Sequence, residues 1–141
     1  MQLQSQDVAK TANDNNSMED RNFRIPLIGE KAPAFTVESI TGTLNFPDDF
    51  VYSWKILFSH PKDFTPVCST EIMELARLQD QFDKLGVKLL VVSIDRLETH
   101  TQWKKALEMV KLEDKPLVNM IFPLIDDEKI VVSKLYGMIH A

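Results

Sequence analysis

The sequence predicts a single α/β domain, and three features lead to this fold class. Segments typical of strands and helices alternate from about residue 52 to residue 137. Such alternation is typical of parallel strands joined by right-handed crossovers. Residues 87–94 (VKLLVVSI) are mostly apolar, as expected for a strand covered on both faces. The length of 141 residues, with 44% hydrophobic and 26% charged, fits one hydrophobic core.

The first elements are expected to be short. Residues 1–22 are rich in Asn, Gln, Asp and Ser and contain few apolar side chains, so we expect a disordered polar tail. The folded domain is expected to span residues 23–141. After a Pro-punctuated extended segment, two short strands at 34–37 and 43–46 are expected to form a hairpin around Gly42.

A buried strand and a long helix are expected next. Residues 52–59 (YSWKILFS) lack helical spacing, are rich in aromatic and aliphatic side chains and precede Pro61, which predicts the strand. The helix is expected to begin with Thr65 as its N-cap and Pro66 as its first residue, and to end at Gly86. Its predicted core-facing residues are Ile72, Leu75, Leu78, Phe82 and Leu85.

Two further helices are expected after the strand at 87–94. Asp95 is expected to cap the first, with Glu98 as the reciprocal partner. Its predicted buried residues are Trp103, Ala106, Leu107 and Val110. A short strand at 122–125 contains Pro123, which favours an edge or a strand start. The acidic residues 126–128 are interpreted as the N-terminal cluster of a helix at 129–136 rather than as a metal site.

Composition excludes several classes of function. The formal net charge of −5 is spread along the chain without a basic run, so no nucleic-acid partner is expected. The start has no basic region followed by an apolar one, and no stretch approaches the roughly 20 apolar residues of a membrane span, so we expect a cytoplasmic protein without a membrane partner. One cysteine and three scattered histidines predict neither a metal site nor a cofactor.

Cys68, the single cysteine, has two interpretations. A free cysteine is more often a small buried hydrophobe than a reactive thiolate. In the first turn of a helix, however, unpaired N–H groups and the helix dipole favour an anion, so its pKa is expected below the free value of about 8.5. Thr65, three residues earlier, serves either as a cap alone or also as a hydroxyl that contacts an oxygen beside the sulfur.

The pattern Pro61-x-x-x-Thr65-x-x-Cys68 resembles the active-site motif of the peroxiredoxin family, P-x-x-x-T/S-x-x-C. The segments 54–61, 63–71, 93–95 and 122–126 resemble this family too, in its alkyl hydroperoxide reductase C and thiol-specific antioxidant type. His60 is similar to the residue at this place in the one-Cys branch. The resemblance implies a thioredoxin-like fold of peroxiredoxin type and a peroxidase that needs no cofactor.

The same resemblance implies roles for individual residues. Cys68 would attack the terminal peroxide oxygen of hydrogen peroxide or an alkyl hydroperoxide, forming a sulfenic acid, and Thr65 would hydrogen-bond the peroxide. The residues expected to shape the substrate pocket are Pro61, Pro66 and Val67, and those expected to support it are His60 and Glu71. The implied partners are a hydroperoxide substrate, an external thiol reductant such as thioredoxin or glutathione, and further copies of the chain in a homo-oligomer.

The chain departs from the family at its C-terminal end, where the fold is expected to be incomplete. Peroxiredoxins continue beyond the counterpart of residues 135–140 into further strands, a helix and an arginine that contacts the thiolate. None of Arg21, Arg24, Arg77 and Arg96 occupies a matching position. Losing such a donor costs on the order of 10²–10³ in rate, and missing strands would expose a sheet edge. We therefore expect a truncated gene product or fragment.

Three alternatives remain open. A thioredoxin-type oxidoreductase is disfavoured because residues 68–71 hold one thiol where that chemistry needs two. A cysteine hydrolase would need His60 or His100 as a base, without supporting sequence context. A catalytically impaired fragment that acts only as an interaction or chaperone-like protein is the main alternative to peroxidase activity.

Overall fold

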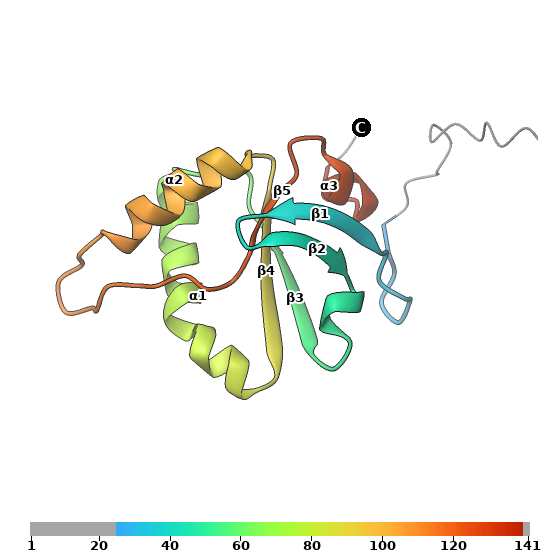
Figure 1. Ribbon diagram of the computed structural model, residues 1–141, viewed down its shortest axis with the longest axis horizontal. Helices are drawn as coiled ribbons and strands as arrows, with labels where there is room; N and C mark the ends of the chain where they lie inside the picture. The colour runs from blue at the N-terminus through green and yellow to red at the C-terminus, as the bar shows by residue number, and fades with distance from the viewer. Residues whose placement is uncertain (1–24, 140–141) are drawn as a thin grey trace, which may run out of the picture.

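A five-stranded mixed sheet forms the centre of the computed structural model, which describes residues 25–139 (Figure 1). The strand order across the sheet is β2-β1-β5-β4-β3. The strands are β1 (Phe35–Ser39), β2 (Gly42–Phe46), β3 (Trp54–Ser59), β4 (Val87–Ser93) and β5 (Leu124–Asp126). The predicted tail at 1–22 lies outside the described residues.

The sheet combines an antiparallel hairpin with a parallel unit. The predicted hairpin is confirmed, because β1 and β2 pair antiparallel from Phe35 opposite Phe46 to Ser39 opposite Gly42. β4 lies between β3 and β5 and is parallel to both, so the carboxyl ends of these three strands meet at one edge of the sheet. Open α/β sheets place their ligand sites at this edge.

Helices cover the two faces of the sheet and create two cores. α1 (Pro66–Lys84) and α2 (Leu97–Glu108) lie together on one face, whereas the short α3 (Val131–Leu135) lies on the other (Figure 1). β4 serves both cores: Leu89 and Val91 face α1 and α2, and Leu90 and Val92 face the hairpin and α3. This confirms the prediction that the strand at 87–94 is buried on both faces.

Several predictions about elements were wrong in detail. Val110, predicted to be buried on the helix after Asp95, lies beyond α2 and is 37% exposed. β3 is not fully buried, because no described strand pairs with its outer edge and Trp54 is 79% exposed. In α1 the buried face is formed by Cys68, Ile72, Met73 and Ala76, while Leu78 and Leu85 are exposed.

The expected capping of α2 by Asp95 was also wrong. The N-cap is Arg96, whose side chain makes no capping bond. The carboxylate of Asp95 instead accepts the backbone N–H of Asp63 at 2.7 Å. Asp127, by contrast, accepts the backbone N–H groups of Val132 and Ser133 in α3, which confirms a capping role within the acidic residues 126–128.

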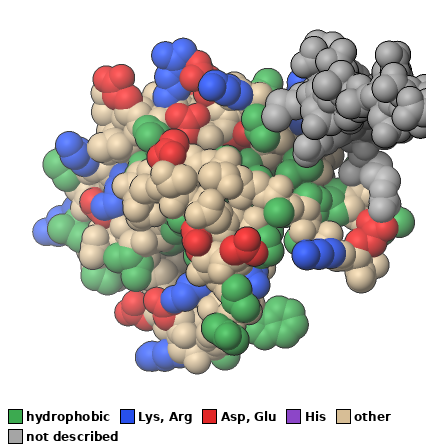
Figure 2. Space-filling model, turned by 45° about the vertical axis from the view of Figure 1, so that its right-hand side comes forward, with side chains coloured by type: hydrophobic (Ala, Val, Ile, Leu, Met, Phe, Trp, Pro, Cys, Tyr) green, Lys and Arg blue, Asp and Glu red, His purple; other side chains and the backbone are tan. Residues whose placement is uncertain are grey.

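The surface mixes charged and hydrophobic side chains. On the face shown in Figure 2, basic and acidic side chains are interspersed rather than gathered into a patch of one sign. None of the helices between residues 25 and 139 combines the length and apolar character that crossing a membrane requires.

Candidate active site

The candidate site lies between the end of β3 and the start of α1. A six-residue loop, 60–65, runs from the carboxyl end of β3 to the N-cap Thr65. Pro66 is the first helical residue, as predicted, and Cys68 therefore lies in the first turn of α1. Phe64 adopts a left-handed backbone conformation with φ of 60°, which costs a residue other than glycine about 1 kcal/mol or more. Surrounding contacts must hold the loop in this shape.

Cys68 is buried at the N-terminal end of α1. It is 6% exposed and belongs to the core cluster that includes Ile72 and Trp103. The backbone N–H groups of the first helical turn have no acceptor within the helix, and the positive end of the helix dipole lies there. The position therefore combines partial shielding from water with an environment that stabilises an anion.

Thr65 occupies the N-cap but does not cap with its side chain. Its backbone φ and ψ are −87° and 143°, and no capping bond from its hydroxyl is present. The hydroxyl donates instead to the carbonyl oxygen of Lys62 at 3.0 Å. The predicted side-chain cap is therefore wrong. Because its hydrogen is used on Lys62, the Thr65 oxygen keeps its lone pairs for a donor such as a hydroperoxide O–H.

The other predicted site residues near the start of α1 differ in how exposed they are. Pro61, Pro66 and Val67 are exposed on the loop and first turn, with Val67 at 69%. Glu71 is exposed too, and its side chain forms no hydrogen bond or ion pair with another described residue. His60 differs from all of them because it is buried, with 3% of the residue exposed.

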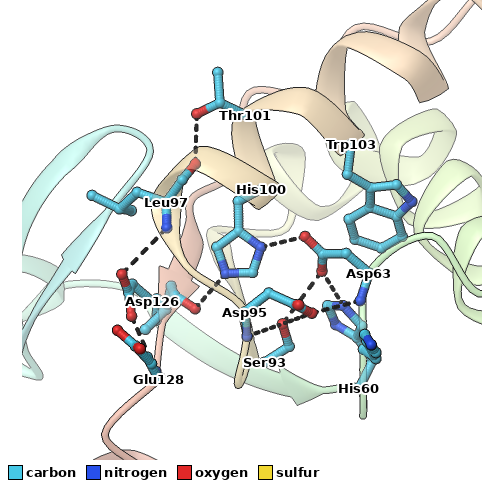
Figure 3. A network of polar contacts seen from close by, with 12 residues as sticks. His60, Asp63, Ser93, Asp95, Leu97, His100, Thr101, Trp103, Asp126 and Glu128 are labelled. Carbon is cyan, nitrogen blue, oxygen red and sulfur yellow. Dashed lines mark hydrogen bonds and ion pairs between the residues drawn. The ribbon is translucent and has the colours of Figure 1, made fainter.

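A buried polar network includes His60 and Asp63 of the loop, and no local sequence pattern predicts it (Figure 3). Asp63 Oδ1 lies 2.8 Å from His60 Nε2, and Asp63 Oδ2 lies 2.6 Å from His100 Nδ1. His100, on α2, donates from Nε2 to the carbonyl oxygen of Ile125 at 2.9 Å. The network therefore joins the active-site loop to α2 and β5.

The end of β4 completes the network. Ser93 Oγ lies 3.3 Å from both Asp63 Oδ1 and Asp95 Oδ2. The indole of Trp103 packs on the His60 ring with 5.0 Å between centroids, and its Nε1 donates to Ser69 Oγ at 3.2 Å. Trp103 thus links His60 to the residue that follows Cys68.

The charges in the network stabilise each other. Burial alone would raise the pKa of Asp63, but the hydrogen bonds from His100 and His60 outweigh it and hold that pKa below the ordinary 3.8. Burial alone would lower the pKa of His100, but the hydrogen bond and attraction to Asp63 raise it above the ordinary 6.5. Both shifts favour an imidazolium beside a carboxylate at pH values between the lowered pKa of Asp63 and the raised pKa of His100.

The described arginines are engaged elsewhere. Arg77 pairs with Glu74 at 2.7 Å, and Arg96 pairs with Glu128; Arg21 and Arg24 lie outside the described residues.

Within residues 25–139, no group of three or more His, Cys, Asp and Glu side chains is placed to hold a metal ion.

Comparison with known proteins decides the family. The model of the AhpC/TSA family matches residues 28–141. The chain belongs to this family. A peroxiredoxin from Methanosarcina mazei is 46% identical over 118 residues, covering 82% of this chain and 53% of the relative. Human peroxiredoxin-6 is 42% identical over 113 residues, which cover 80% of this chain and 50% of that protein.

Solved structures of the family share the fold. The yeast mitochondrial 1-Cys peroxiredoxin superposes with a TM-score of 0.74 at 40% identity, covering 83% of this chain and 53% of its own. A cysteine-to-serine mutant of peroxiredoxin 6 from Arenicola marina superposes with a TM-score of 0.70 at 36% identity, covering 79% of this chain and 50% of its own. These matches confirm the predicted thioredoxin-like fold of peroxiredoxin type. The chain spans about half the length of the curated relatives it matches.

Proposed function

We propose that this chain is a thiol-dependent peroxidase that reduces hydrogen peroxide and alkyl hydroperoxides through Cys68. The observation that carries the proposal is the place of Cys68: buried, in the first turn of α1, directly after the loop that follows β3. Membership of the AhpC/TSA family and the peroxiredoxin names of its relatives support it.

The proposed reaction begins with the Cys68 thiolate. Its sulfur attacks the terminal oxygen of the hydroperoxide, so that an S–O bond forms and the O–O bond breaks. The leaving oxygen takes a proton and departs as water or an alcohol, and Cys68 becomes a sulfenic acid. Thr65 accepts a hydrogen bond from the peroxide, and the backbone N–H groups of Val67 and Cys68 stabilise the developing charge.

An external thiol is proposed to complete the cycle. Cys68 is the single cysteine of the 141 residues, so one thiol from outside condenses with the sulfenic acid, releases water and forms a mixed disulfide. A second thiol then frees Cys68. The yeast relative is described as resolved through glutathione and thioredoxin systems, which supports thiols of this class. A homo-oligomer and a cytoplasmic location remain further predictions, testable by sedimentation and cell fractionation.

Peroxide consumption with a supplied thiol tests this function. The wild-type protein is expected to consume hydrogen peroxide, and the Cys68→Ser variant is expected to lose this activity because serine lacks a nucleophilic thiolate. Gln102→Ala, an exposed position on α2 outside the site, serves as a control. Equal, background-level rates for wild type and Cys68→Ser would reject the peroxidase and favour the interaction or chaperone-like alternative.

A further inference from the structure

The contacts of His100 define where its hydrogens are. Its Nε2 lies 2.9 Å from the carbonyl oxygen of Ile125, and because a carbonyl only accepts, Nε2 carries a hydrogen. Its Nδ1 lies 2.6 Å from Asp63 Oδ2, a contact that needs a second hydrogen. Both nitrogens therefore donate, and His100 is an imidazolium that neutralises the Asp63 carboxylate.

This pair in turn defines the state of His60. His60 Nε2 lies 2.8 Å from the carboxylate oxygen Oδ1 of Asp63, so Nε2 is the protonated nitrogen. His60 Nδ1 is buried and has no hydrogen-bond partner within residues 25–139. A proton there would add a buried positive charge and an unpaired donor, both of which are costly. The charge of Asp63 is already balanced by His100, so His60 stays neutral.

The same contacts hold the active-site loop. The backbone N–H of Asp63 donates to Asp95 Oδ2 at 2.7 Å, while its carboxylate binds both histidines. Asp63 is thereby attached to the ends of β3 and β4 and to α2. The next residue, Phe64, has the left-handed backbone, and Thr65 and the first turn of α1 follow directly.

We propose that Asp63 and His100 are positioning residues of the active site, whose ion pair fixes the loop before Cys68 and holds His60 as the neutral Nε2–H tautomer. The part of this inference that concerns rate rests on the peroxidase function proposed above. His60 lines a cavity of about 340 Å³ together with Pro61 and Ser93.

The groups that face the pair set its pH range. His100 faces Asp63 from the loop, the more distant Asp95 from the β4–α2 connection, and the Ile125 carbonyl from β5. His60 faces Asp63 from the end of β3. When His100 loses a proton at a pH above its raised pKa, one of its ring nitrogens faces an oxygen acceptor without a hydrogen, and the positive charge that balances Asp63 is lost. The charge balance that keeps His60 neutral is then lost.

NMR of the histidine nitrogens tests the tautomer in the unmodified chain. In protein labelled with ¹⁵N-histidine at pH 6, below the raised pKa of His100, we expect protons on both nitrogens of His100 and on Nε2 alone of His60. His60→Asn and His100→Asn assign the signals. A doubly protonated His60, a His60 with the proton on Nδ1, or a neutral His100 would overturn the inference. This measurement needs no enzymatic activity, so it is independent of the peroxidase proposal.

The effect on the reaction is tested with His100→Gln and Asp63→Asn. We expect both to lose the single His60 tautomer, and the rate of Cys68 oxidation by hydrogen peroxide to fall on the order of 10²-fold from the displaced loop. Gln102→Ala, on the same helix and exposed, is expected to change neither quantity. A folded His100→Gln variant with the wild-type rate would overturn the positioning role.

Three remaining outcomes are also decisive. A slower His100→Gln variant whose His60 signals are unchanged would show a structural role without tautomer control and would overturn the inference. If neither variant folds, the wild-type spectrum alone decides the tautomer. If wild-type Cys68 fails to react with peroxide while the predicted histidine signals are present, the peroxidase proposal fails and the tautomer assignment stands.

Discussion

Asp63 is a buried carboxylate whose charge is matched by the residues around it. His60 and His100 donate to its two oxygens, and Ser93 lies within 3.3 Å of one of them. Removing one partner of a buried ion pair leaves an uncompensated charge, which typically costs about 3–5 kcal/mol. The network therefore contributes to the stability of the fold as well as to the geometry of the loop.

The stability of the protein should depend on pH through this pair. The pKa of His100 is raised above 6.5, so its contribution is complete below that value and is lost as pH rises through the raised pKa. The pKa of Asp63 is lowered below 3.8, so its contribution is complete above that value and is lost as pH falls through the lowered pKa. The ion pair stabilises most between these limits.

Urea unfolding of wild type and His100→Gln across this range measures the effect. We expect the difference in the free energy of unfolding to be largest between about pH 4 and pH 6.5 and to shrink at higher pH. A difference that stays constant from pH 5 to pH 9 would show that His100 does not act through its charge.

The sequence predicts the chemistry proposed for Cys68 but not the residues that hold its loop. Pro61, Thr65 and Cys68 lie within eight consecutive positions, so their spacing is visible locally. Asp63 and His100 are 37 residues apart and meet only because α2 packs beside the end of β3. One signal was present: polar residues follow both β3 and β4, and parallel neighbouring strands end at the same edge.

At the scale of elements, local sequence signals predicted the ends of α1 better than they predicted which strands and helix faces are buried. The start of α1 at Pro66 and its end before Gly86 follow from residues that act on their own backbone, and Gly86 has the positive φ of 69° expected after a helix. The burial of β3 depends instead on its neighbours. An apolar run does not tell whether a strand lies inside a sheet or at its edge, where β3 lies.

α3 offers a test of capping by an upstream carboxylate. Asp127 accepts from the N–H groups of Val132 and Ser133 and from the Ser133 hydroxyl, at 2.6–2.9 Å. Asp127→Ala should lower the free energy of unfolding by about 2 kcal/mol, because buried donors lose their acceptor. Lys129→Ala, which is exposed nearby, should change it by less than about 0.5 kcal/mol. Similar thermal unfolding of both variants would contradict the assignment.

At the scale of the whole molecule, the outer edge of β3 is the feature most open to association. No described strand pairs with this edge, and Tyr52 and Trp54 beside it are 100% and 79% exposed. Unpaired strand edges next to apolar side chains favour pairing with another chain. We therefore expect the 141-residue chain to self-associate through β3.

Sedimentation over a range of concentrations tests this expectation. Trp54→Lys should weaken association by about tenfold or more, because a large exposed aromatic residue is replaced by a charge. Met109→Lys, a similarly exposed apolar position outside β3, should have little effect. Wild-type protein that remains monomeric at every concentration would refute the proposed role of this edge.

Because the chain spans about half the length of its relatives, the central claim is best tested on the 141-residue chain itself. Intact mass spectrometry after one equivalent of hydrogen peroxide, with a sulfenic-acid trap added, measures the first chemical step at Cys68 without a reductant. We expect one trapped adduct at Cys68 and none in Cys68→Ser. An unmodified Cys68 in folded protein, under conditions that oxidise a free thiol of similar exposure, would contradict it.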